Sequence, residues 1–194
     1  MPERRPGEKS LRADARRNRA SLIAAAREAF AAGELDLRME ALARRAGVGI
    51  GTVYRHFPTR DALIEAVYRA EVDRLCAAAD TLLAEHPPDE ALRRFLEHLV
   101  AHLAANLGLA RALGTEMVAS GIPRQHGDEQ VLQALTALMS AARCAGRIRS
   151  DIRPETVALT LSVVCIDPEH PQWSAQAAEV IALIMDGLRA TARP

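Results

Sequence analysis

Apolar positions recur along the chain with the 3.6-residue period of amphipathic helices, and short breaks divide the pattern into nine predicted helices. In the first third, this spacing predicts a helix over about 14–32 and two short helices over about 39–46 and 50–56. Gly33, Gly47 and Pro58 follow these helices, at positions where glycine and proline end helices. The six later helices are predicted over about 60–85, 89–107, 110–118, 129–145, 154–166 and 172–190.

Segments without this period predict the connections and the division of the chain. Residues 1–13 contain two prolines and several basic residues, which predicts a flexible basic arm. The polar segment SGIPRQHGD, 120–128, predicts a loop. The segment TVALTLSVVCI, 156–166, is apolar enough to be a buried strand, but we favour a helix because no second strand is available to pair with it. The fold is therefore predicted to be all-α, with a three-helix unit over 14–59 and a larger helical unit over 60–194.

Composition limits the class of protein. Hydrophobic residues make up 49% of the chain and aromatic residues only 3%, so aliphatic side chains must fill the core. No apolar run is long enough to span a bilayer, and no apolar segment of the secretory type follows the basic N-terminus. Cys76, Cys144 and Cys165 are odd in number and far apart, which favours reduced cysteines and a cytoplasmic protein.

The two parts of the chain differ in charge although the net charge is zero. Residues 1–60 contain 13 Arg and Lys against 7 Asp and Glu, a net charge of +6, whereas the remainder contains 12 against 18. A basic first third is typical of a chain with one end that binds a polyanion. A merely solvated arginine-rich tail would have the same composition, so charge alone does not decide between the two.

The segment MEALARRAGVGIGTVYRHFPTRDAL, 39–63, has the spacing of a helix-turn-helix. Such a unit needs a small residue where its two helices touch, a glycine at the turn, and apolar residues that fix both helices to one core. These positions are Leu42, Ala43, Gly47, Val48 and Val53. In an alanine-rich chain this spacing is moderate support for the motif.

The end of this segment resembles the TetR/AcrR family, whose recognition helix and its exit read roughly T-[LV]-Y-x-[HY]-F and then [KR]-[DE]-x-L. Here the chain has TVYRHF at 52–57 and RDAL at 60–63. The resemblance implies an all-α homodimer that binds double-stranded operator DNA and regulates transcription, usually as a repressor that a small-molecule effector releases. Arg38 stands where the family usually has a Ser or Thr that caps the second helix, so we expect that cap to be missing.

The motif residues also suit DNA chemically. Thr52, Tyr54, His56 and Arg60 carry donors that can reach phosphate oxygens, and the first residues of a recognition helix contact base edges. Ile50 between two glycines can approach a thymine methyl group closely, while Arg55 can bind either guanine or phosphate. The arginines near the N-terminus are either solvated or minor-groove contacts, and these are Arg4, Arg5, Arg12, Arg16 and Arg17. The expected DNA-binding residues are Arg38, Gly49, Ile50, Gly51, Thr52, Tyr54, Arg55, His56 and Arg60.

The resemblance also implies that the last two helices form a four-helix bundle with those of a second subunit. Both helices carry more apolar positions than the core of one subunit needs. The expected interface residues are Val157, Leu161, Val164, Val180, Ile181, Ile184 and Leu188.

The larger unit is expected to bind the effector, because ligand sites are mostly apolar with a few polar groups. Its expected site residues are Phe95, His102, Asn106, Arg111, Glu116 and Met117. His98 and His102 have a spacing that suits a metal, but ordinary exposed or hydrogen-bonded histidines are the better interpretation. We therefore expect no metal and no cofactor.

Two other functions compete with this prediction. An enzyme on a helical scaffold is disfavoured because no nucleophile elbow, glycine-rich phosphate loop or HExxH motif occurs in the sequence. An architectural DNA binder without an effector would not need the residues beyond the first third. DNA affinity that no small molecule alters would support that alternative, and turnover of a substrate would support the enzyme.

Overall fold

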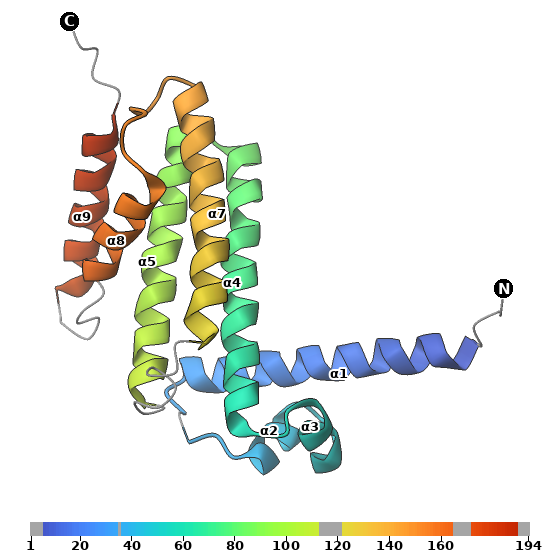
Figure 1. Cartoon of the computed structure of the whole chain (residues 1–194). Coiled ribbons are helices and arrows are strands. Elements are labelled where there is room, and N and C mark those ends of the chain that lie inside the picture. The colour runs from blue at the N-terminus through green and yellow to red at the C-terminus, as the bar shows by residue number, and fades with distance from the viewer. Residues whose placement is uncertain (1–5, 35, 113–121, 165–171, 190–194) are drawn as a thin grey trace, which may run out of the picture. The chain divides into compact units, whose positions relative to one another are not determined.

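The computed structural model describes residues 6–34, 36–112, 122–164 and 172–189 (Figure 1). They form eight helices and no strand, which confirms the all-α prediction. The helices are α1 (Pro6–Ala31), α2 (Met39–Arg45), α3 (Ile50–His56), α4 (Arg60–Glu85), α5 (Pro88–Ala112), α7 (Ile122–Cys144), α8 (Pro154–Val164) and α9 (Trp173–Leu188). The chain divides into two compact units, unit 1 over residues 1–70 and unit 2 over residues 71–194. The division falls inside α4, whereas the sequence predicted it at the start of that helix.

Unit 1 is built on one small hydrophobic core. Among the described side chains of α1, the buried ones lie in the C-terminal half, beginning at Leu22, and they pack with the inner faces of α2, α3 and the first turns of α4. The core consists of Leu22, Ala26, Ala29, Leu37, Met39, Leu42, Ala43, Val53, Phe57, Leu63, Ala66 and Val67. The spacing that predicted a helix-turn-helix therefore fixes α2 and α3 to one core.

The turn between α2 and α3 depends on Gly47. This residue has φ 65°, in the left-handed region that strains other residues. The N–H of Val48 donates to the carbonyl of Ala43 at 3.0 Å, and the N–H of Gly47 donates to that of Arg44 at 3.3 Å. These two bonds form the Schellman motif, which satisfies carbonyls at the end of α2 and directs the chain into α3. A side chain at residue 47 would cost about 1–2 kcal/mol.

Three helix bounds differ from the sequence prediction. Helix α1 begins at Pro6, whereas the sequence predicted a flexible arm over 1–13. The helix forms there because proline suits the first helical position, and Lys, Leu, Arg and Ala in the following turns favour helix. Helix α7 begins at Ile122, inside the loop expected over 120–128, with proline again in the first turn. Helix α5 continues to Ala112, and the rest of the helix expected over 110–118 lies outside the described residues. The helical state of 154–164 confirms helix over strand there.

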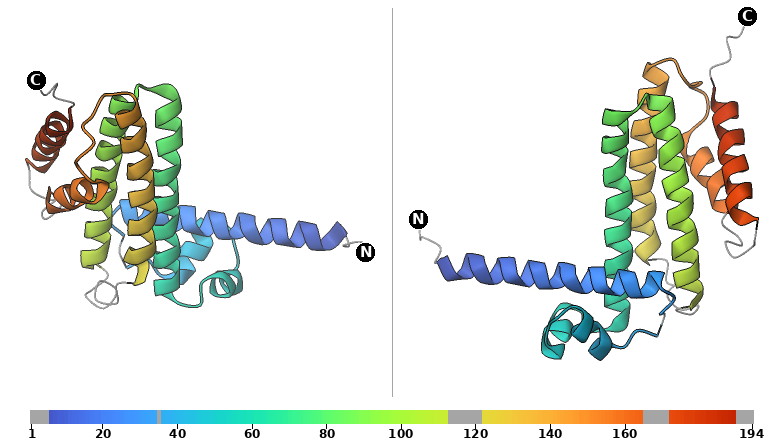
Figure 2. Two further views of the ribbon diagram at one scale, coloured as in Figure 1. Left: turned by 45° about the horizontal axis from the view of Figure 1, so that its top comes forward. Right: turned by 180° about the vertical axis from the view of Figure 1, so that it is seen from behind.

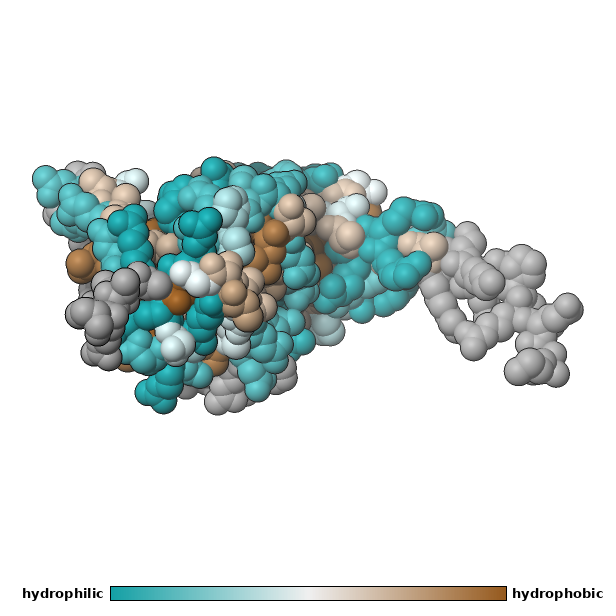
Figure 3. Space-filling view, turned by 90° about the horizontal axis from the view of Figure 1, so that it is seen from above, coloured by the Kyte–Doolittle hydropathy of each residue, from teal (hydrophilic) through white to brown (hydrophobic). Residues whose placement is uncertain are grey.

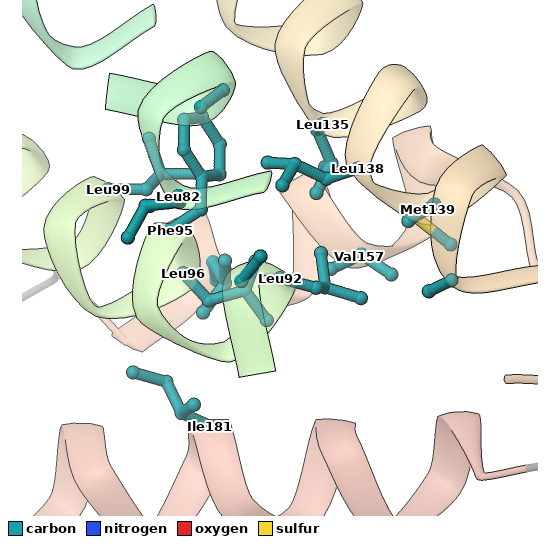
Figure 4. Packing of buried hydrophobic residues seen from close by; sticks show 14 of the residues in the cluster. Leu82, Leu92, Phe95, Leu96, Leu99, Leu135, Leu138, Met139, Val157 and Ile181 are labelled. Carbon is teal, nitrogen blue, oxygen red and sulfur yellow. The ribbon is translucent and has the colours of Figure 1, made fainter. Parts of the chain in front are cut away.

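Unit 2 encloses the larger core. Part of α4 packs with α5, α7, α8 and α9 around Phe95 and the leucines next to it (Figure 4). The turn after α7 is fixed to the end of α9, because the N–H of Arg149 donates to the carbonyl of Leu188 at 2.8 Å. From above, the surface is mainly hydrophilic with small separate hydrophobic patches (Figure 3). Within the described residues, no helix is long and apolar enough to cross a membrane.

Candidate nucleic-acid interface

Helix α3 divides its side chains between the core and the surface. Val53 and Phe57, four residues apart, are buried, and Phe57 is only 1% exposed. Ile50 and Tyr54 are instead 41% and 46% exposed, which is high for large hydrophobic residues on a small folded unit. Arg55 is also exposed, while Thr52 and His56 are half-buried. The sequence placed Val53 in the core, and the structure confirms this.

Gly49 and Gly51 leave open space on either side of Ile50. A Cβ atom at either position would meet no other atom within 4 Å. Gly49 caps α3 with φ −71°, and Gly51 is not among the glycines with positive φ. Neither packing nor backbone conformation in the chain itself therefore requires glycine at these two positions.

Arg38 precedes the first residue of α2 in the N-cap position, with extended backbone geometry and no side-chain hydrogen bond to the helix. The expected loss of the Ser or Thr cap is therefore confirmed. At the other end of α2, the guanidinium of Arg45 donates to both carboxylate oxygens of Glu34 at 2.7 and 2.6 Å. This bidentate pair ties the end of α2 to the segment that follows α1, and it leaves Arg44 as the exposed cation of the last turn.

Two interactions fix the chain where α3 ends. The N–H of Phe57 donates the last backbone bond of α3 to the carbonyl of Val53 at 2.8 Å. The hydroxyl of Thr59 then accepts a bond from the N–H of Ala62 at 3.1 Å and caps α4, which begins with half-buried Arg60. The sequence prediction missed Thr59, although a threonine one residue before a helix is a recognised capping signal.

Arg19 of α1 reaches the same end of α3. Its guanidinium carbon lies 5.2 Å from the centroid of the Phe57 ring, within the range of a cation–π contact. The His56 ring is next to the same phenylalanine ring, and their centroids are 6.3 Å apart. The sequence prediction did not include Arg19, because nothing local relates it to a ring so far along the chain.

Unit 1 contains several arginines that have no acidic partner among the described residues. In the part of this unit that the structure describes, Arg16, Arg19, Arg38, Arg44 and Arg55 form no ion pair. Exposed cations beside an exposed helix face provide what a polyanion needs for binding without sequence preference. The basic composition of the first third thus corresponds to uncompensated charge around α2 and α3.

The expected effector residues are only partly placed. Phe95 is fully buried and packs with Leu82 and Leu99 in the core of unit 2 (Figure 4), so it is a core residue of that unit. His102 is half-buried, and this burial lowers its pKa below 6.5. The side chains of Asn106 and Arg111, and all of Glu116 and Met117, lie outside the described residues. The described residues contain no group of three His, Cys, Asp or Glu that could hold a metal.

The expected dimer residues are mostly core residues of one subunit. Val157, Leu161, Ile181 and Leu188 are at most 4% exposed in the single chain, and Figure 4 shows Val157 and Ile181 directed toward the leucines of the core. They are buried because α8 and α9 pack against α5, so they are not free to form an interface as expected. Val180 and Ile184 are half-buried, and the side chain of Val164 lies outside the described residues. Among the described side chains of α8 and α9, the exposed large apolar residues are instead Leu159 and Leu183, 68% and 72% exposed.

Two family models match the chain. One, described as bacterial regulatory proteins of the tetR family, matches residues 22–67, and the other, described as the C-terminal domain of SbtR-like transcriptional regulators, matches residues 87–190. Together they span both units of the structure.

Individual proteins agree with these models. A TetR transcriptional regulator from Streptomyces coelicolor is 46% identical, with 90% of this chain and 99% of that chain covered and a TM-score of 0.76. A TetR transcription regulatory protein from Mycobacterium vanbaalenii is 39% identical, with 92% and 99% covered and a TM-score of 0.72. An HTH-type transcriptional regulator from Staphylococcus aureus is 30% identical over 82 residues, 41% of this chain and 42% of that protein. The chain thus aligns with about two fifths of the length of this curated relative.

Proposed function

The chain belongs to the TetR family of DNA-binding transcriptional regulators, and on that premise we propose that its α2–α3 surface binds double-stranded operator DNA with α3 in the major groove. The observation that carries this proposal is that α3 has one buried face and one exposed face. Its inner residues are buried, while Ile50, Tyr54 and Arg55 are exposed and the two glycines beside Ile50 leave open space.

The residues of this surface divide into two kinds of contact. Gly49, Ile50 and Gly51 begin α3 and face base edges, where Ile50 meets a thymine methyl group. The hydroxyl of Tyr54 and the ring N–H of His56 donate to backbone phosphates. The remaining assigned residues are Arg38, Thr52, Arg55 and Arg60, which donate to phosphates around the groove, with Arg55 also able to reach guanine.

The proposed functional unit is a homodimer formed by the exposed faces of α8 and α9. A two-fold dimer presents the same surface from both subunits, so the interface must come from residues that a single chain leaves exposed. Leu183 of α9 is the most exposed large hydrophobic residue in the described part of the chain, and Leu159 of α8 is next. Half-buried Val180 and Ile184 border this surface.

Unit 2 is proposed to sense a small-molecule effector, and the protein to act as a cytoplasmic repressor without a catalytic role. An effector shifts the equilibrium only if it binds the non-DNA conformation more tightly than the DNA-bound one. The aliphatic core favours a modest, largely apolar ligand, with His102 as a polar contact at its edge. The substitution His102→Leu is expected to reduce the potency of such an effector and leave DNA affinity without it unchanged.

The DNA-binding proposal is tested by fluorescence anisotropy with labelled DNA duplexes. Tyr54→Phe and His56→Ala should each weaken binding by about 1–2 kcal/mol for every duplex sequence, because each removes a bond to a phosphate. Tyr68→Phe is the matched control, since Tyr68 is the other tyrosine of the chain and lies on α4. Unchanged affinity of both α3 variants, or equal weakening by the control, would contradict the proposed surface.

A further inference from the structure

Arg19 lies where α1 leaves the core of unit 1. Among the described side chains of α1, the first buried one is Leu22, and none over 13–20 is buried. Helix α1 nevertheless continues through this region and extends past α3 (Figure 2). The Arg19 side chain is exposed and is held by one partner, the ring of Phe57. Arg19 therefore lies beside α3 on a helix that makes no core contact there.

The charge of Arg19 is not compensated within unit 1. Arg17, two residues away on α1, pairs with Asp14, whereas Arg19 has no ion pair or hydrogen bond among the described residues. A guanidinium over the face of an aromatic ring does not use its N–H groups in that contact, so they can donate to an oxyanion. The contact with Phe57 thus orients the side chain without using its donors.

Arg19 and His56, which belongs to the proposed DNA surface, both lie near the Phe57 ring. The guanidinium carbon of Arg19 lies 5.2 Å from the centroid of the Phe57 ring, and the His56 ring centroid lies 6.3 Å from it. His56 is assigned to a phosphate in the proposed function, so a phosphate at His56 brings the DNA backbone to the same phenylalanine. An arginine donates to phosphate oxygens in a bidentate, charge-assisted manner.

We propose that Arg19 is a further DNA-contacting residue, which binds a backbone phosphate next to the one at His56 and is held in place for it by the Phe57 ring. This inference rests on the proposed DNA-binding surface. It adds a contact from α1 to those from α2 and α3, and it makes the core residue Phe57 a positioning residue for that contact.

The salt dependence of DNA binding tests this inference, because a phosphate contact releases counterions and a merely structural contact does not. The slope of log affinity against log salt concentration falls by about 0.9 for each phosphate contact that is lost on duplex DNA. Arg19→Gln should therefore lower the magnitude of the slope by about 0.9 per bound subunit. It should also weaken binding on the order of tenfold at low salt.

Two further variants separate charge from position. Arg17→Gln is the matched control, because it removes the same charge from the same helix at a residue that pairs with Asp14, and its slope should equal that of the parent. Arg19→Lys keeps the charge but lacks the planar guanidinium that lies over the Phe57 ring, so its slope should be close to that of the parent and its affinity intermediate. Circular dichroism confirms that each variant is folded.

The outcomes distinguish this inference from the function on which it rests. If Tyr54→Phe and His56→Ala weaken binding while Arg19→Gln leaves both slope and affinity unchanged, Arg19 is a solvated arginine and only this inference fails. If Arg19→Gln weakens binding without changing the slope, its role is structural and the phosphate contact is refuted. If none of the α3 variants weakens binding, the proposed surface itself is wrong.

Discussion

The substitution Gly51→Ala should make the free protein more stable and its DNA complex weaker. Gly51 lies in the first turn of α3, without positive φ, and a Cβ there meets no atom within 4 Å. Glycine inside a helix is less favourable than alanine by about 0.5–1 kcal/mol, mainly because of backbone entropy. We therefore expect the free energy of unfolding to rise by about that amount. The added methyl group points into the space that the proposed DNA complex fills.

DNA affinity should fall because the methyl group prevents close approach of α3 to the base edges. The expected loss is about 1–3 kcal/mol per half-site, the scale of one wrong base pair in an operator. Urea denaturation measures the stability of the free protein, and fluorescence anisotropy with a bound duplex measures affinity. Gly187→Ala is the control for helix propensity alone, since Gly187 lies in α9 with no atom near its added Cβ, and it should raise stability. Gly187 is one turn from Leu183 of the proposed interface, so the control does not test DNA binding. Light scattering checks that the control remains a dimer.

A Gly51→Ala variant that binds DNA as tightly as the parent would refute the role of Gly51 in close approach. A variant that is less stable than the parent would instead refute the argument from helix propensity. Opposite changes in stability and affinity in the same variant are the result that the structure supports.

Three further predictions concern unit 2. Leu183→Asp should give a folded monomer with weakened operator binding, whereas Ile181→Asp should unfold the chain because it buries an unpaired charge. Light scattering and circular dichroism distinguish the two outcomes. A Leu183→Asp variant that remains dimeric would contradict the proposed interface. Burial lowers the pKa of His102, so the unfolded chain binds its proton more readily and the stability of the parent should fall as pH drops through 6.5. In urea titrations the stability of the parent relative to His102→Leu should therefore decrease toward low pH, and parallel pH profiles would contradict this. Arg93 and Arg94 lower the pKa of Glu90 from 4.5 to about 2, so Glu90→Gln should cost about 1 kcal/mol or less at pH 7, with the difference disappearing as pH falls from 4.5 toward 2.

The helix-turn-helix could be predicted from the sequence because its determinants are local. Gly47 fixes the turn through its own backbone conformation, and Val53 and Phe57 are buried because they lie four residues apart on one short helix. The same local reasoning failed for the start of α1. The basic residues before Asp14 suggested an arm, but most of them are also good helix formers, and the helix begins at Pro6.

The residues of unit 2 could not be assigned because their roles depend on which helix face packs inside the subunit. Apolar residues on α8 and α9 are needed both for the core of one chain and for an interface, and periodicity does not distinguish the two uses. The sequence therefore assigned Ile181 and Leu188 to the dimer, whereas α5 and its neighbours bury them in the same chain. Arg19 was missed for a related reason, since its partner Phe57 becomes adjacent only in the folded unit.

The central claim, that α3 of a dimer reads operator DNA, is tested most directly by selecting bound duplexes from a random DNA pool. The parent protein should enrich two inverted half-sites whose centres are about 10 base pairs apart, one helical turn, or a multiple of that distance. The variant Ile50→Ala should relax the preference at one position of each half-site and leave the spacing unchanged. A pool that shows no enriched sequence, or the same preference at every position with Ile50→Ala, would contradict the account.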